Sequence, residues 1–123
     1  MAITLNTTLR DARATAIVTE AGATAKLSVY TASYATLLYT STCAATLGTV
    51  SGGVLTFNAV GNATAVAAGT AAIARLFKTD GTTMVIEGLT VGTSGTNIVI
   101  TNTTIAVSDT VTTSSATITE GNP

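Results

Sequence analysis

The sequence predicts an α+β domain that is mostly β. An N-terminal helix at about residues 6–21 is followed by an antiparallel, jelly-roll-like β-sandwich at about residues 25–119. Apolar residues recur at a helical spacing only before Gly22. After Gly22, β-branched residues dominate and turn residues recur about every 8–12 positions, which is typical of a sandwich or barrel. The 123 residues suit one domain, residues 1–123.

The predicted helix has a single apolar face. Its members recur with a period near 3.6 residues: Leu9, Ala12, Ala16 and Ile17. Thr8 and Asp11 form a weak capping box at its start, and Gly22 stands where a glycine ends a helix. A single helix of this length is marginal alone in water, so we expect it to pack on the strands.

The rest of the chain is predicted as short strands separated by turns. Turn signals stand at residues 51–53 (Ser-Gly-Gly) and 80–81 (Asp-Gly). Residues 59–70 are open between thin strands, a loop and low-complexity disorder. The predicted strands are residues 25–31, 37–47, 54–60, 71–78, 83–90, 97–101, 103–107 and 111–119.

The Asp-Gly hairpin can be assigned a register from its two-residue loop. That loop pairs Thr79 with Thr82, Phe77 with Met84, Arg75 with Ile86 and Ala74 with Glu87. Ile73, Phe77, Met84 and Ile86 then share one face, and Leu76 and Val85 lie on the other. Both faces are apolar, so we expect one to be core and one to be covered by the helix or another subunit. On this basis Leu76→Asp is predicted to abolish oligomerisation and leave the monomer folded.

Charge excludes one class of partner. Only 9% of residues are charged and the net charge is −1. The basic residues never form a run, so the electrostatic footprint of a nucleic-acid-binding protein is missing.

No apolar stretch approaches the about 18–20 residues of a membrane-spanning helix, and the N-terminus lacks the pattern of a signal peptide. The sequence therefore predicts no nucleic-acid partner, no membrane partner and synthesis in the cytosol.

Catalytic chemistry is not indicated. The chain contains no His, the commonest general base and metal ligand, and no motif places a base beside a nucleophile. The carboxylates Asp80, Glu87, Asp109 and Glu120 are too scattered to form a metal loop. Residues 92–95 (Gly-Thr-Ser-Gly) precede a strand, whereas a phosphate loop opens a helix. We therefore predict no enzyme activity and no catalytic, cofactor-binding or metal-binding residues.

Two further side chains have expected environments. Cys43 has no partner for a disulfide, and we expect it to be a small buried apolar residue. Arg75 is the one charge embedded in an apolar strand face. It should pair with Glu87 or Asp109, and contact with a partner protein is the alternative.

Low charge also indicates an assembled protein. Soluble monomers usually carry about 25% charged residues, but this chain instead contains 29 Thr and 21 Ala. A surface of Thr, Ser, Asn and Ala near neutrality favours association. The sequence therefore predicts a homo-oligomer.

Several segments resemble one protein family. They are ITLNTTLRDARATAIVTEAGA leading into KLSVYT, GTAAIARLFKTDGTTMVIEG, VGTSGTNIVI and the closing ATITEGN. Together they are similar to short proteins encoded among the virion structural genes of tailed bacteriophages. The resemblance covers nearly the whole chain except residues 31–36 (TASYAT), where relatives have a longer loop with Gly and Pro.

The resemblance implies a head decoration or minor capsid protein. Such proteins are small β-rich modules, often trimeric, on the outer capsid surface at three-fold positions. It thus implies binding to the major capsid protein, location on the virion, a stabilising role and no catalytic residues. One alternative is a tail, neck or tail-tip structural protein of the same virion. Another is a glycan- or receptor-binding module built on Tyr30, Tyr34 and Tyr39, which cluster in the sequence.

Overall fold

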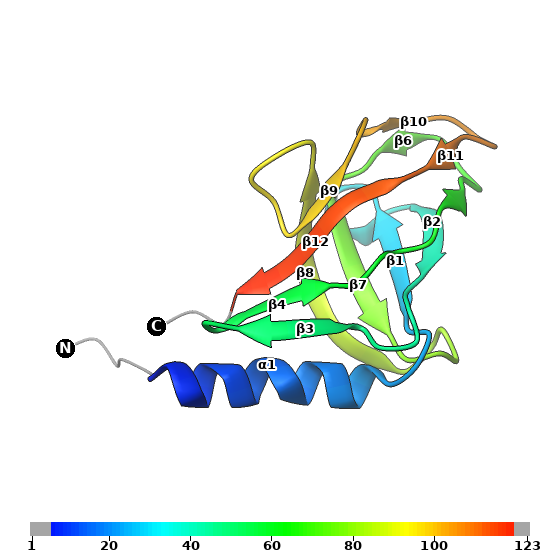
Figure 1. Ribbon diagram of the computed structural model, residues 1–123. Coiled ribbons are helices and arrows are strands. Elements are labelled where there is room, and N and C mark those ends of the chain that lie inside the picture. The colour runs from blue at the N-terminus through cyan, green and yellow to red at the C-terminus, as the bar shows by residue number, and fades with distance from the viewer. Residues whose placement is uncertain (1–5, 120–123) are drawn as a thin grey trace.

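The computed structural model describes residues 6–119 and confirms the α+β, mostly β class. One helix, α1 (Thr7–Ala21), lies along the outer end of a curled, sandwich-like sheet, next to β3 and β4 (Figure 1). A short 3-10 helix, η1 (Ala32–Tyr34), joins the first two strands. The strands are β1 (Lys26–Tyr30), β2 (Leu37–Thr42), β3 (Gly48–Ser51), β4 (Val54–Phe57), β5 (Ala63–Thr64), β6 (Gly69–Thr70), β7 (Ile73–Phe77), β8 (Met84–Gly92), β9 (Ile98–Ile100), β10 (Thr104–Ile105), β11 (Thr110–Val111) and β12 (Thr113–Thr119).

The main sheet has eight strands in the order β2-β1-β7-β8-β9-β12-β4-β3. Its two edge strands, β2 and β3, are consecutive in the chain, and six residue steps from Thr42 to Gly48 span at most about 22 Å. In a flat sheet these edges would lie about 34 Å apart, at about 4.8 Å per strand. The sheet must therefore curl, and its inner face encloses the core.

The pairing is antiparallel except between β8 and β9, which run parallel. That parallel pair and strand β3 were not predicted from the sequence. Residues 59–70, which the sequence left open, contribute β5 and β6. These pair with β11 and β10 in two small sheets at the far end of the molecule from α1 (Figure 1).

The predicted helix exists, but its orientation and its cap differ from the prediction. Asn6, not Thr8, is the N-cap, and its Oδ1 accepts a hydrogen bond from the Leu9 amide at 2.8 Å. Leu9 is 46% exposed, and of the predicted apolar face only Ile17 is half-buried. The fully buried helix residues are Ala14 and Ala21.

A polar contact fixes the rotation of the helix. The Asp11 carboxylate accepts a hydrogen bond from the Gly53 amide at 2.6 Å, in the turn between β3 and β4. The Arg10 guanidinium packs directly over Gly53, where a Cβ atom would come within 2.8 Å of it. These contacts hold the Arg10 and Asp11 side of α1 against the sheet and turn Leu9 toward solvent.

The core lies on the inner face of the sheet. The pairing of β1 with β2 and β7, and of β7 with β8, places five apolar residues on one side of the sheet: Leu27, Val29, Tyr39, Leu76 and Leu89. All five are buried. Burial raises the pKa of the Tyr39 hydroxyl. Cys43 is also buried, as predicted, and burial, opposed by the charge of Lys26, raises the pKa of its thiol to about 11.

The β7–β8 hairpin keeps part of the predicted register. Phe77 pairs with Met84 as expected, but Arg75 pairs with Glu87 and Leu76 with Ile86, so the predicted Arg75–Ile86 and Ala74–Glu87 pairs are wrong. Two bulges cause the difference, because Val85 and Gly88 each add an unpaired residue to β8. Gly88 has φ +81°, a conformation that favours glycine.

Asp80 organises the tip of this hairpin. Its carboxylate accepts hydrogen bonds from the Thr83 hydroxyl and from the Thr83 and Thr82 amides. In that order, these bonds lower its pKa from 3.8 to about 2. The folded state therefore favours the ionised carboxylate.

This lowered pKa predicts an acid-dependent contribution to stability. The contribution is complete above the unfolded pKa of 3.8 and is lost as the pH falls through the folded pKa of about 2. Urea unfolding from pH 7 to pH 2 should show wild type more stable than Asp80→Asn at neutral pH. The difference should vanish toward pH 2, and one that is independent of pH would contradict the prediction.

Candidate functional site

The outer face of strands β2, β1, β7 and β8 is the most distinctive surface of the described chain. It consists of three rows of residues that run across the strands. The rows are Thr42, Lys26, Phe77 and Met84; Thr40, Ser28, Arg75 and Glu87; and Leu37, Tyr30, Ile73 and Thr90. We call these twelve residues the outer face.

The outer face is partly apolar and partly exposed to solvent, with Ser28 buried near its middle. Met84 is 49% exposed and Leu37 is 39% exposed, while Ile73 and Phe77 are half-buried. The helix packs mainly against β3 and β4. Ile73, Phe77 and Met84 share this face as the sequence predicted, whereas Ile86 lies opposite Leu76 on the other side.

The expected role of Leu76 is wrong. The sequence predicted that Leu76 lies on the subunit interface, but its side chain is fully buried in the core. The predicted register separated Leu76 from Phe77 and Met84 but placed Ile86 on the wrong face. Both faces are apolar, so their pattern did not show which one the curled sheet encloses.

A cluster around Arg75 occupies the middle of the outer face. The guanidinium carbon lies 3.7 Å from the ring centre of Tyr34 and 5.3 Å from that of Tyr30. The two rings meet edge to face, with their centres 5.4 Å apart. The Arg75 Nε lies 3.3 Å from Glu87 Oε2. Of the two partners that the sequence predicted for Arg75, Glu87 and Asp109, Glu87 is therefore the one observed. Desolvation acts to lower the Arg75 pKa, but Tyr30 and Glu87 outweigh it and the net shift is upward.

Backbone strain accompanies this cluster. Ser33 and Tyr34 both have φ +58°, a left-handed conformation that costs a non-glycine residue roughly 1 kcal/mol or more. Tyr34 offsets this cost because its hydroxyl accepts a hydrogen bond from the Gly88 amide at 2.7 Å. The segment joining β1 and β2 is thereby tied to the bulge of β8.

Removing the Tyr34 hydroxyl tests this link. Tyr34→Phe keeps the ring beside Arg75 but leaves the Gly88 amide without its acceptor, so we expect a loss of about 1 kcal/mol in the free energy of unfolding. Tyr34→Ala also loses the ring contact and should cost more. Urea denaturation measures both, and a Tyr34→Phe midpoint equal to that of wild type would contradict the link.

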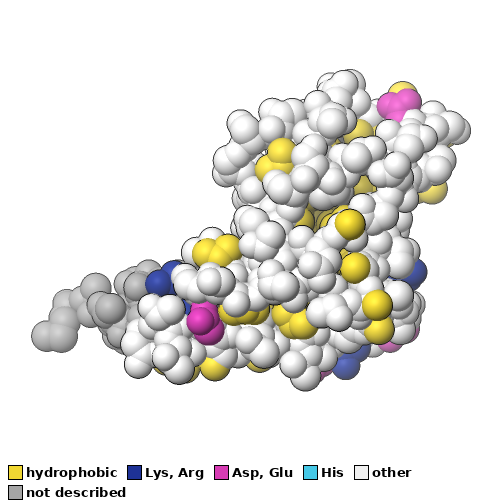
Figure 2. Space-filling model, viewed as in Figure 1, with side chains coloured by type: hydrophobic (Ala, Val, Ile, Leu, Met, Phe, Trp, Pro, Cys, Tyr) yellow, Lys and Arg dark blue, Asp and Glu magenta, His cyan; other side chains and the backbone are white. Residues whose placement is uncertain are grey.

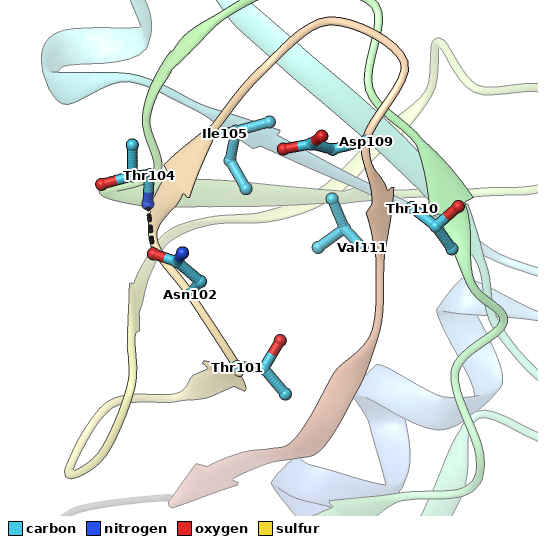
Figure 3. A pocket seen from close by; sticks show the side chains of 7 residues that line it. All are labelled: Thr101, Asn102, Thr104, Ile105, Asp109, Thr110 and Val111. Carbon is cyan, nitrogen blue, oxygen red and sulfur yellow. Dashed lines mark hydrogen bonds between the residues drawn. The ribbon is translucent and has the colours of Figure 1, made fainter.

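A second site is a shallow hollow of about 210 Å³ between the β9–β10 and β11–β12 segments (Figure 3). Its lining is mainly polar and uncharged: Thr101, Asn102, Thr104, Ile105, Asp109, Thr110 and Val111. Asn102 accepts a hydrogen bond from the Thr104 amide, and Asp109 accepts one from the Ala106 amide. Asp109, the single carboxylate that lines the hollow, therefore stabilises the turn that begins at Ala106.

The sequence-predicted aromatic cluster is only partly assembled. Tyr30 and Tyr34 come together, but Tyr39 is fully buried on the inner face and cannot touch a ligand at the surface. Among residues 6–119, no three His, Cys, Asp or Glu side chains are grouped as a metal site would require. Glu120 lies outside the described residues.

Sequence reasoning missed the Tyr34–Gly88 contact and the position of Tyr34 beside Arg75. Tyr34 and Arg75 are far apart in the chain, and only the order of strands in the sheet brings them together. The composition of residues 31–36 gave no sign of the left-handed backbone, because glycine and asparagine are absent there.

Comparison with known proteins identifies no relative. No protein-family profile, no curated protein and no solved structure matches the chain. Within residues 6–119, no helix is both long enough and apolar enough to cross a membrane.

Proposed function

We propose that this protein is a structural component of a tailed-phage virion, a decoration or minor capsid protein that binds the outer capsid lattice and stabilises it. The observation that carries the proposal is the outer face: an open sheet face with apolar side chains on a chain that is only 9% charged. The resemblance of the sequence to virion structural proteins supports the same assignment. On the face shown in Figure 2, few side chains are charged, and most of the surface is formed by backbone, polar uncharged and apolar groups.

Such a surface suits a protein that functions while covered by neighbours. The major capsid protein is the proposed partner, and the protein itself forms a homo-oligomer, for which the resemblance implies a trimer. Contacts repeated many times on one particle can each be weak, because simultaneous attachment raises the overall avidity. Neither catalysis nor a cofactor is part of this role.

Cryo-electron microscopy of the purified virion tests the proposal. We expect density for this protein as protrusions on the outside of the head, and particles that lack it should lose those protrusions and release DNA at a lower temperature. Hexameric rings along the tail or at the neck would instead establish the alternative structural role. Absence of the protein from the purified particle would overturn both.

The Arg75 cluster supports one further candidate, a glycan- or receptor-binding module. Tyr30 and Tyr34 are half-buried aromatic side chains next to a charged pair, a combination that occurs at recognition sites. A glycan array probed with wild type and with Tyr30→Ala tests it. Binding that Tyr30→Ala abolishes would favour this candidate over a purely structural role.

A further inference from the structure

We propose that a rigid apolar knob, at the end of the molecule farthest from α1, inserts into an apolar pocket of the major capsid protein. The knob consists of residues 66–68, between β5 and β6, and residues 106–107, between β10 and β11. This inference rests on the proposed function and names the surface of the chain that meets the shell.

The two halves of the knob lie side by side because the two small sheets are the ends of one ribbon. Ala63 pairs with Val111 at one end of the ribbon, and Thr70 pairs with Thr104 at the other. Seven positions separate these two pairs on either strand, so the register is the same at both ends. The two segments of the knob are therefore opposite each other in the middle of the ribbon.

The knob carries the two most exposed large apolar side chains of residues 6–119. Val66 is 66% exposed and Val107 is 59% exposed. Ala68 and Ala106 are also exposed, and the connection between β10 and β11 projects from the end of the molecule (Figure 1). Single exposed apolar residues are ordinary, but neighbouring ones on a projecting end are typical of an interaction site.

Hydrogen bonds make the knob rigid. The Ala65 amide donates to the Asp109 carbonyl at 2.8 Å, and the Val66 amide donates to the Leu38 carbonyl of β2 at 2.8 Å. The Asp109 carboxylate accepts a hydrogen bond from the Ala106 amide at 2.9 Å. Both segments are thus fixed before any partner arrives, and a preformed surface loses little conformational entropy when it binds.

The chemistry of the ribbon fits an apolar partner. Asp109 is the only charged residue within residues 63–70 and 104–111, and its carboxylate is engaged in its own turn. The knob itself contains only valine and alanine side chains. Burial of apolar area is therefore the favourable contribution that it can make to binding, and a pocket lined by apolar side chains is its complement.

The size of the knob favours a regular shell over a second free copy. A stable interface buries about 800 Å² on each partner, which is far more than two valines and three alanines can supply. Such a contact becomes strong only when several are made at once. In a cyclic oligomer, such as the trimer that the resemblance implies, symmetry places every knob at the same height along the axis. All copies can then enter equivalent pockets of one shell together.

Binding of the purified protein to purified heads that lack it tests this contact. Val66→Thr and Val107→Thr keep the shape of the side chain but bring a hydroxyl group into the apolar pocket. Each should weaken binding by about tenfold or more, as measured by co-sedimentation with the heads. Leu9→Thr is the matched control, because it removes an exposed apolar side chain of α1, outside the knob, and should bind as wild type.

Urea denaturation and sedimentation of the free variants separate the possible outcomes. Each variant should keep the wild-type midpoint and the wild-type oligomeric mass, because the knob is exposed and is not placed between copies. Folded valine variants that bind heads as wild type would overturn the inference and leave the capsid proposal standing. Loss of oligomeric mass would assign the knob to contacts between copies and would overturn it too. Failure of wild type to bind the heads would overturn both proposals.

Discussion

Leu76→Asp is expected to unfold the protein rather than to separate subunits. Leu76 is fully buried on β7, between Leu27 of β1 and Ile86 of β8. A carboxylate there would lose its hydration with no cation or donor provided for it, in addition to the lost apolar burial. We expect a loss of about 5 kcal/mol or more, comparable to the whole stability of a small domain.

Circular dichroism and urea denaturation measure the effect of Leu76→Asp. Val107→Asp is the matched control, because Val107 is 59% exposed and an aspartate there should change stability by less than about 0.5 kcal/mol. If Leu76→Asp cannot be purified, Leu76→Ala should still lose about 3 kcal/mol. A folded Leu76→Asp protein with the wild-type midpoint would show that Leu76 is not in the core.

The second large effect is expected at Gly48, where β3 begins. A Cβ atom at this position would collide with the Thr56 carbonyl oxygen of β4 and would lie 2.9 Å from the Phe57 Cα. Both contacts are with backbone, so no side-chain rotation can relieve them. Gly48→Ala must push β3 away from β4, and we expect it to cost about 3 kcal/mol.

Gly52→Ala is the control for Gly48→Ala. Gly52 has φ +60° but no atom within 4 Å of its Cβ position, so only backbone strain of about 1 kcal/mol is expected there. Urea denaturation should therefore separate the two variants by about 2 kcal/mol. Equal midpoints would contradict the close approach of β3 and β4.

Sequence patterns predicted the elements better than their environments. The 3.6-residue spacing of apolar residues located the helix, and the β-branched runs with the Asp-Gly turn located the Asp80 hairpin, because these signals depend on local chemistry. The helix face was missed because Ala14 and Ala21, its fully buried residues, are small, and the Asp11–Gly53 hydrogen bond helps to hold this face against the sheet. That bond joins residues 42 positions apart, which no local periodicity reports.

The candidate site was predicted in part for a similar reason. Sequence reasoning left Glu87 and Asp109 as alternative partners of Arg75, and the structure places Glu87 beside it. The bulge at Gly88 shifted the register, and the left-handed Ser33 and Tyr34 placed an aromatic ring beside Arg75. Bulges and left-handed residues without glycine signals depend on tertiary contacts, so spacing alone did not predict this cluster.

The position of β12 has a consequence for how the chain folds. This last strand pairs with β9 on one side and with β4 on the other. In the order of the main sheet it separates β3 and β4 from the five strands β2, β1, β7, β8 and β9. The sheet therefore cannot become continuous until residues 113–119 have been synthesised. Until then β9 and β4 each present an unpaired strand edge.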